Sequence, residues 1–327
     1  MSFYIKNIEI KERVILAPMA GITSFSYRKF MNPFGCGLTV TEMISDCGLV
    51  YKNKRTEEML YTDGSDRPLS VQLFGGETET LLQAIDRLDE LGVKYDLLDL
   101  NLACPVPKVT KNNGGSKWLL DLNRLEEMVT KIGNRSKKPV TAKIRLGWNK
   151  INVYEVCKLL EKCGVSFISI HARTKEELYS GKPHFEEISD LKNVIKIPFG
   201  VSGNIFSVED ALTALNITKA DAILVARGGI GNPELITNIN KAINGEEYND
   251  TLDFNRQVTY LKTFTELLIK EKGKTRAMSI LRGLAPKFLL KLDIEGIKEL
   301  RNKITTKSKT IDDLFNYIDE FKKGNHL

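Results

Sequence analysis

Cysteine and histidine are scarce in this chain, and none of them is spaced to hold a metal ion. The 327 residues include five cysteines and three histidines, and no two cysteines have the C-x-x-C spacing. No histidine lies at ligand spacing from a cysteine, which argues against a structural zinc site or a disulfide framework. We therefore expect no metal site. Four cysteines have the character of free thiols that fill a core; these are Cys36, Cys47, Cys157 and Cys163.

Long apolar runs are missing as well. No window approaches the roughly 18 uninterrupted apolar residues of a membrane span. The first residues, Met1–Lys6, lack the apolar core and the small-residue cleavage site of a secretion signal. We expect a cytoplasmic protein that does not enter a membrane. Nothing in the sequence demands a second copy, so we also expect a monomer.

Positive charge slightly exceeds negative charge, and the excess is unevenly placed. The formal net charge is +6. Residues 251–310 carry 14 Lys and Arg against 6 Asp and Glu, whereas the remaining residues sum to −2. A basic segment attached to a near-neutral body indicates that a polyanion docks on that segment. The alternative is an ordinary solvated helix face in a lysine-rich chain.

Short, nearly continuous apolar runs recur along the first part of the chain, as in parallel strands that are covered on both faces. The runs are Val14–Ala17, Leu38–Thr41, Leu69–Leu73, Leu97–Leu100, Val140–Ile144, Phe167–Ile170, Ile197–Val201 and Ala222–Ala226. Amphipathic stretches lie between most of them, including Thr78–Leu91, Leu122–Gly133, Val153–Cys163 and Val208–Leu215. Eight such units over about 235 residues match a TIM (β/α)8 barrel in number and length.

The strand pattern stops near residue 245. Four amphipathic stretches follow, at Leu252–Lys270, Arg276–Leu292, Ile294–Ile304 and Ile311–Lys322. We therefore expect an α/β fold in two domains. A catalytic TIM barrel would span residues 1–243, and a small all-helical domain would span residues 244–327.

Polar or charged residues stand at or just beyond the end of seven of the eight apolar runs. They are Glu42, Gln72, Asn101 with Cys104, Lys143 with Arg145, His171 with Arg173, Ser202-Gly203-Asn204, and Arg227-Gly228-Gly229; Pro18 and Met19 follow the first run. The carboxyl ends of the strands form one rim of a TIM barrel, and function collects at that rim. The sequence therefore predicts a functional site there.

The loops after the last two runs indicate the type of ligand. Ser202-Gly203-Asn204 follows the seventh run, and Arg227 precedes two glycines after the eighth. Glycine lets backbone N–H groups approach a phosphate, and an arginine adds a charge-assisted contact. These loops are the usual phosphate site of the fold. We expect a phosphorylated cofactor or substrate.

Three other strand-end residues suit a flavin. Lys143 can stabilise negative charge at the pyrimidine ring of a reduced flavin, and His171 ends the neighbouring strand. Gln72 can donate and accept at once, as the uracil-like edge of isoalloxazine requires. A lone histidine such as His171 is otherwise most often a satisfied core residue.

The segment Asn101–Pro105 places a thiol just beyond a strand end. A free thiol has a pKa of about 8.5 and is mostly protonated at neutral pH. Cys104 can therefore serve as a general acid, or as a nucleophile if a base lowers its pKa. The amide of Asn101 can hold the edge of a pyrimidine. The residues by themselves leave the substrate open.

Seven motifs, in order and at the expected spacing over roughly residues 10–240, resemble the tRNA-dihydrouridine synthase family. They are Ala17-Pro18-Met19-Ala20-Gly21, Thr41-Glu42-Met43, Val71-Gln72-Leu73, Asn101-x-x-Cys104-Pro105, Lys143-Ile144-Arg145-x-Gly147-Trp148, Ile170-His171-x-Arg173-Thr174 and Ala226-Arg227-Gly228. The C-terminal part resembles that family's helical tRNA-binding domain more loosely, chiefly through Arg282 and Arg301.

The resemblance implies an FMN-dependent oxidoreductase that uses NADPH to reduce uridine in tRNA to 5,6-dihydrouridine. Hydride would go from reduced FMN to C6 of uracil, and Cys104 would give the proton to C5. The implied FMN-binding residues are Pro18, Met19, Ala20, Gln72, Lys143, His171, Ser202, Gly203, Asn204, Ala226 and Arg227. The implied substrate-binding residues are Asn101, Lys108, Arg145 and Arg173.

Some positions depart from the family pattern, and two rival functions remain. Ser202-Gly203-Asn204 stands where Asn-Gly-Asp is usual, Ala226 replaces a glycine, and residues 112–118 form a bulkier loop. The rival enzyme is an FMN-dependent dihydroorotate or dihydropyrimidine dehydrogenase, in which the basic C-terminal helices would have no role. The other rival is an RNA-binding protein that keeps the barrel only as a scaffold.

Overall fold

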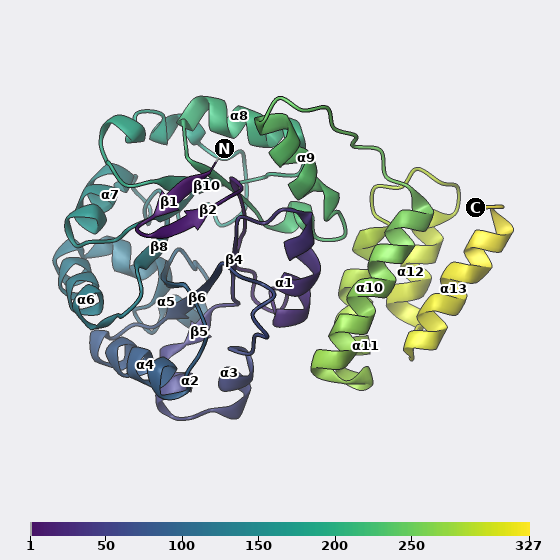
Figure 1. Ribbon diagram of the computed structural model, residues 1–327, viewed down its shortest axis with the longest axis horizontal. Helices are drawn as coiled ribbons and strands as arrows, with labels where there is room; N and C mark the ends of the chain where they lie inside the picture. The colour runs from purple at the N-terminus through teal and green to yellow at the C-terminus, as the bar shows by residue number, and fades with distance from the viewer. Residues whose placement is uncertain (1) are drawn as a thin grey trace.

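Eight short strands, in which almost every residue is buried, close into a parallel barrel. The computed structural model describes residues 2–327, and Figure 1 shows helices around this barrel. The barrel strands are β3 (Val14–Leu16), β4 (Leu38–Val40), β6 (Leu69–Phe74), β7 (Leu97–Leu102), β8 (Val140–Arg145), β9 (Ile168–His171), β10 (Phe199–Ser202) and β11 (Ala222–Val225). Strand β11 pairs with β3, and β4 pairs with β6, so the sheet closes. Each predicted run overlaps one of these strands, and the predicted TIM barrel is confirmed.

Helices cover the outside of the barrel. They are α1 (Phe25–Met31), α2 (Asp46–Val50), α3 (Lys54–Glu58), α4 (Thr78–Glu90), α6 (Leu122–Arg135), α7 (Val153–Lys162), α8 (Val208–Thr218) and α9 (Glu234–Ile243); the short helix α5 (Pro107–Thr110) lies instead at the carboxyl end of the barrel. Helix α6 continues past Gly133, where the sequence predicted its end, because Ser136 still bonds back to Ile132. The short turns are η1 (Asn32–Phe34), η2 (Gly115–Leu120), η3 (Phe185–Ile188), η4 (Leu191–Asn193) and η5 (Arg227–Gly229).

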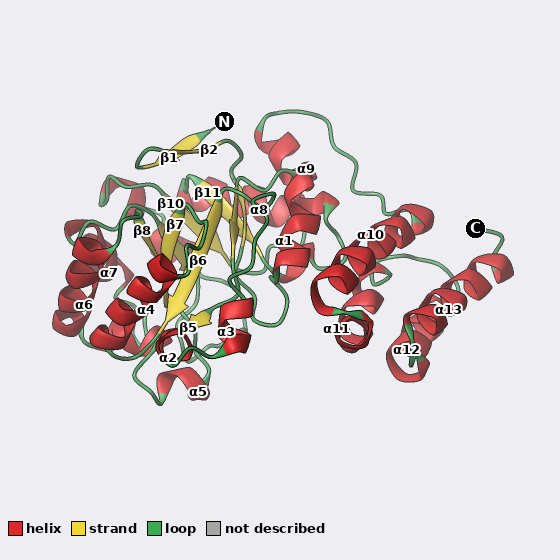
Figure 2. Cartoon of the chain, turned by 60° about the horizontal axis from the view of Figure 1, so that its bottom comes forward, coloured by secondary structure: helices red, strands yellow, loops and turns green. Residues whose placement is uncertain are grey.

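A β-hairpin closes one end of the barrel. Its strands, β1 (Phe3–Ile5) and β2 (Ile8–Ile10), place Ile5 and Ile10 in the same buried cluster as Phe167 of the barrel. Figure 2 shows this hairpin at one end and the strand β5 (Ile44–Ser45) with α5 at the other. The plugged end is the amino-terminal end of the strands, so the carboxyl-end rim is the one open to a ligand.

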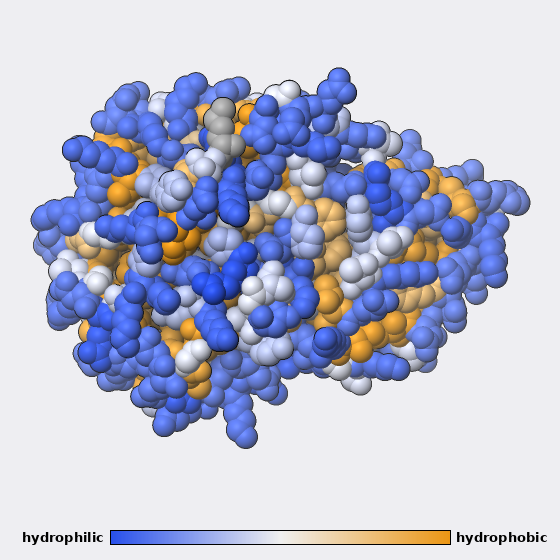
Figure 3. Space-filling view, in the orientation of Figure 1, coloured by the Kyte–Doolittle hydropathy of each residue, from blue (hydrophilic) through white to orange (hydrophobic). Residues whose placement is uncertain are grey.

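Four helices follow the barrel, as predicted. They are α10 (Phe254–Lys272), α11 (Lys274–Phe288), α12 (Ile297–Lys307) and α13 (Ile311–Gly324). Figure 1 shows this bundle beside α1 and α9, and apolar residues appear along the seam in Figure 3. One hydrophobic core runs from the barrel into the bundle. The division into two domains at residues 243 and 244 stays a prediction. No helix within residues 2–327 is both long and apolar enough to cross a membrane.

The cysteines expected in the core are only partly there. Cys36 and Cys157 are buried, Cys163 is half-buried, and Cys47 is exposed. Cys47 lies in the five-residue helix α2, which is too short to turn every apolar residue inward.

Phe264 joins the bundle to the barrel. Its ring is 1% exposed and lies 5.6 Å from Tyr27 and 5.5 Å from Phe30, centroid to centroid, both on α1. We expect Phe264→Ala to lower the free energy of unfolding by about 3–5 kcal/mol, because the cavity it leaves cannot fully collapse. Urea unfolding measures this. Tyr248→Ala, at a ring that is 43% exposed, is the control, and equal losses for both variants would contradict the packing described.

Candidate active site

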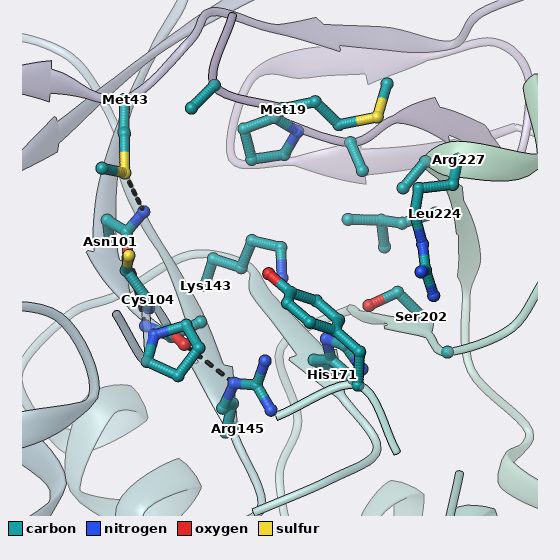
Figure 4. Close-up of a pocket in the computed structure, with 18 of the residues that line it drawn as sticks. Met19, Met43, Asn101, Cys104, Lys143, Arg145, His171, Ser202, Leu224 and Arg227 are labelled. Carbon is teal, nitrogen blue, oxygen red and sulfur yellow. Dashed lines mark hydrogen bonds between the residues drawn. The ribbon is translucent and has the colours of Figure 1, made fainter. Parts of the chain in front are cut away.

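A cavity of about 460 Å³ opens at the carboxyl-end rim of the barrel. Fourteen residues named from the sequence line it together: Pro18, Met19, Ala20, Gln72, Asn101, Cys104, Lys143, Arg145, His171, Ser202, Gly203, Asn204, Ala226 and Arg227. Figure 4 shows Asn101 and Cys104 on one wall, Ser202 and Arg227 on the other, and Lys143 pointing between them. Lys108 and Arg173 do not line the cavity.

Cationic side chains line the cavity. Lys143, Arg145 and Arg227 are among its lining residues, and no Asp or Glu of residues 2–327 is. The ammonium of Lys143 makes no hydrogen bond or ion pair within residues 2–327. Burial, with the charge of Arg145 acting in the same direction, lowers the pKa of Lys143 to about 8. Lys143 is therefore still charged at neutral pH, and the cavity suits an anionic ligand.

The loops after β10 and β11 offer donors for a phosphate. The backbone N–H groups of Gly203 and Asn204 make no hydrogen bond within the described chain. Gly203 has φ +146, and a Cβ there would lie 2.7 Å from the side chain of Pro183. Across the loop, the guanidinium of Arg227 stacks over Tyr179 at 5.3 Å and Phe206 at 5.6 Å, without an ion pair among residues 2–327. This is a donor set that an incoming anion would complete.

His171 is held neutral. Burial is the main cause that puts its pKa well below the usual value, followed by the charges of Lys143 and Arg145. Arg173 lies 3.1 Å from Nε2 of His171. A guanidinium can only donate, so Nε2 accepts and the ring proton sits on Nδ1. Arg173 itself is fully buried and also donates to the carbonyls of Ser180 and Gly181. It therefore fixes the loop and the imidazole.

A chain of hydrogen bonds orients the amides on the opposite wall. The buried carboxylate of Asp99 accepts from Nε2 of Gln72 at 2.6 Å, and Oε1 of Gln72 accepts from Nδ2 of Asn101 at 2.8 Å. Because a carboxylate only accepts, this order fixes which way both amides point. Oδ1 of Asn101 is then left to accept from the backbone N–H of Cys104 at 2.9 Å. Three hydrogen bonds in sequence therefore connect the buried side chain of Asp99 to the backbone of Cys104.

Hydrogen bonds from Ser116 also fix the turn that carries Cys104. Its carbonyl accepts from both the backbone N–H and the hydroxyl of Ser116, each at 3.1 Å. Gly115 is required next to it, because it has φ +58 and a Cβ there would lie 2.5 Å from the Cys104 carbonyl oxygen. Burial raises the pKa of the Cys104 thiol, against smaller opposing effects from the Val106 N–H and the charge of Arg145. The thiol is therefore protonated at neutral pH, as a proton donor must be.

Comparison with known proteins identifies the family. The model of the family described as Dihydrouridine synthase (Dus) matches residues 15–323. The chain belongs to the dihydrouridine synthase family. A relative named tRNA-dihydrouridine synthase B, from Pseudomonas aeruginosa, is 34% identical over 241 residues, which are 73% of this chain and 72% of the relative. A probable tRNA-dihydrouridine synthase from Rickettsia bellii is 30% identical over 281 residues, 85% of this chain and 86% of the relative.

Solved structures of lower similarity share the fold of this family member. An old yellow enzyme homologue from Zymomonas mobilis has a TM-score of 0.52 at 11% identity, covering 80% of this chain and 95% of that structure. The 6-hydroxypseudooxynicotine amine oxidase of Pseudomonas geniculata has a TM-score of 0.56 at 13% identity, covering 75% and 49%. These similarities concern the fold alone.

Several cavity residues of this dihydrouridine synthase family member were not predicted from its sequence. Met43, Tyr179 and Phe206 all line the cavity. Tyr179 is 54% exposed and stacks on both Arg145 and Arg227. None of the three stands directly at the end of an apolar run. Of the three, only Met43 could have been predicted from the sequence, because it follows Glu42 in one of the seven motifs.

Proposed function

We propose that this protein reduces uridine in tRNA to 5,6-dihydrouridine, with FMN as its bound cofactor and NADPH as the reductant. The observation that carries the proposal is the thiol of Cys104, which lines a cavity together with cationic side chains in a member of the dihydrouridine synthase family. The relatives named tRNA-dihydrouridine synthase support tRNA as the substrate. The choice of NADPH rests on the resemblance of the motifs.

The residues around the cavity fit FMN. Its phosphate would lie against the guanidinium of Arg227 and the backbone N–H groups of Gly203 and Asn204, which make no hydrogen bond or ion pair among the described residues. Its pyrimidine ring would lie near Lys143, whose ammonium makes no ion pair within residues 2–327. When bound, FMN would supply the hydride for C6 of uracil.

In the proposed reaction, the protein itself supplies the proton, from Cys104. The S–H bond of Cys104 breaks as a bond forms from its hydrogen to C5 of uracil, and with hydride on C6 the C5–C6 double bond becomes a single bond. The sulfur is left as a thiolate near the charges of Arg145 and Lys143, which stabilise it until it takes a proton from solvent. The amide of Asn101, held by Gln72, would fix the edge of the base beside the thiol.

The cavity can accept a base only after that base leaves its stack, which costs a few kcal/mol. Phosphate contacts to the basic segment 251–310 would offset that cost, because each neutralised phosphate releases counterions. We place the tRNA on the helical bundle with the target uridine in the barrel. The protein would act as a monomer in the cytoplasm.

Substrate choice tests the proposal against the rival enzyme. The purified, yellow protein is mixed with NADPH and either unmodified tRNA or a free pyrimidine such as uracil or orotate, and NADPH oxidation is followed. We expect turnover with tRNA only; parallel assays with free dihydroorotate and an oxidant should show none. Turnover of the free pyrimidine without turnover of tRNA would favour the dehydrogenase. A colourless protein without flavin would favour the scaffold.

Lys143 gives the proposed activity a pH dependence. With its pKa near 8, this side chain is charged below pH 8 and becomes neutral as the pH rises through it. We expect kcat/KM for tRNA to be level below pH 8 and to fall above it. Lys143→Arg keeps the charge, so the fall should move to higher pH, where the thiol of Cys104 ionises. An unchanged fall near pH 8 in Lys143→Arg would assign it to another group.

A further inference from the structure

Three loops of the carboxyl-end rim meet at one aromatic ring. The ammonium of Lys117 lies 5.1 Å from the ring centroid of Trp148, and that of Lys175 lies 4.4 Å from the same centroid. Lys117 belongs to η2, after β7; Trp148 follows β8; Lys175 follows β9. Residues far apart in sequence are thus brought together by neighbouring strands.

The two lysines repel one another, and no carboxylate of residues 2–327 pairs with either of them. Neither forms an ion pair or a side-chain hydrogen bond within the described part of the chain. The carboxylate of Glu177 is close in sequence, but it accepts from the backbone N–H and the hydroxyl of Thr174. Cation–π attraction to Trp148 is what holds both charges beside one ring. Two fixed cations without an anion form a site that a phosphate would complete.

This cluster lies beside the part of the cavity where the proposed proton donor stands. The turn η2, which carries Lys117, also carries Ser116, and Ser116 holds the Cys104 carbonyl. Trp148 is three residues beyond Arg145, and Lys175 is four residues before Tyr179, and both of these line the cavity. The loops after β7 and β8 lead into α6 and α7. In Figure 1 these helices lie on the side of the barrel away from the bundle.

We propose that Lys117, Trp148 and Lys175 form a phosphate clamp for the RNA strand that carries the target uridine. The proposal rests on the proposed function. RNA seated on the basic bundle and reaching the cavity meets this cluster beyond it, so the strand is held on both sides of the extracted base. Leu120 and Leu178, exposed by 49% and 46% on the same loops, give unstacked bases an apolar surface.

The salt dependence of tRNA affinity distinguishes the role of the two lysines from that of Trp148. The affinity of the FMN-loaded protein for unmodified tRNA is measured by fluorescence anisotropy over a range of salt concentrations. Lys117→Gln and Lys175→Gln should each weaken binding several-fold and reduce the slope of log K against log salt by about 0.7–0.9. Trp148→Leu should weaken binding with the slope unchanged, because it removes no charge. Trp148→Phe, which keeps an aromatic face, should bind nearly as the unaltered protein does.

A lysine at the other end of the barrel provides the control. Lys11→Gln removes one exposed charge beside the β1–β2 hairpin and should leave both affinity and slope unchanged. Bound-flavin absorbance checks that each variant is folded. If both clamp lysines match Lys11→Gln while the protein still reduces tRNA, the clamp is wrong and the proposed function stands. If the unaltered protein neither binds nor reduces tRNA, the proposed function itself fails.

Discussion

Cys104→Ala should lower the rate of uridine reduction in tRNA by about 10²- to 10⁴-fold, the usual contribution of a positioned general acid. The alanine leaves no proton donor beside C5, while the turn held by Ser116 and Gly115 remains. The rate is best measured in a single turnover, by mixing the reduced protein with tRNA and following flavin oxidation. This isolates the chemical step from the reaction with NADPH.

Two controls make that loss specific. Cys47→Ala removes a thiol that is exposed and does not line the cavity, and it should leave the rate unchanged. The affinity of Cys104→Ala for tRNA and its bound-flavin absorbance should match those of the unaltered protein. Reduction of tRNA by Cys104→Ala at the full rate would show that the proton comes from elsewhere.

Arg227→Ala should weaken FMN binding by about 1.5–3 kcal/mol, or roughly 10- to 150-fold, the value of a hydrogen bond to a charged group. Its guanidinium has no ion pair among residues 2–327, so the substitution leaves no described carboxylate without a partner. Flavin titrated into the deflavinated protein, followed by fluorescence quenching, gives the dissociation constant.

Riboflavin, which lacks the phosphate, is the matched ligand for this test. The unaltered protein should prefer FMN to riboflavin, and Arg227→Ala should lose most of that preference while binding riboflavin as before. Lys143→Met, at the proposed pyrimidine end, should weaken both ligands alike. An undiminished preference for FMN in Arg227→Ala would place the phosphate elsewhere.

The sequence was most informative where strands end. A parallel strand buried on both faces rarely holds an unpaired charge, so Arg145 at the last residue of β8 and Arg227 just after β11 indicated the rim. The carboxyl ends of all the parallel strands of a barrel meet at one rim, which is why residues predicted one by one line a single cavity. Their individual roles stay predictions.

The sequence was less informative in loops and at short elements. Tyr179 and Phe206 reach the cavity through irregular backbone, which has no period to read. The strands β1 and β2 have three residues each, too few to show alternation. The sequence also did not show that the guanidinium of Arg173, predicted as a substrate contact, donates to the carbonyls of Ser180 and Gly181. Such contacts depend on tertiary structure.

The most direct test of the account is the mass of the nucleosides in tRNA after incubation with the purified protein and NADPH. The account predicts that a uridine in unmodified tRNA gains two hydrogens in the presence of the unaltered protein, and that almost none is converted by Cys104→Ala in the same time. An unchanged tRNA with a flavin-loaded, NADPH-reduced protein would contradict it.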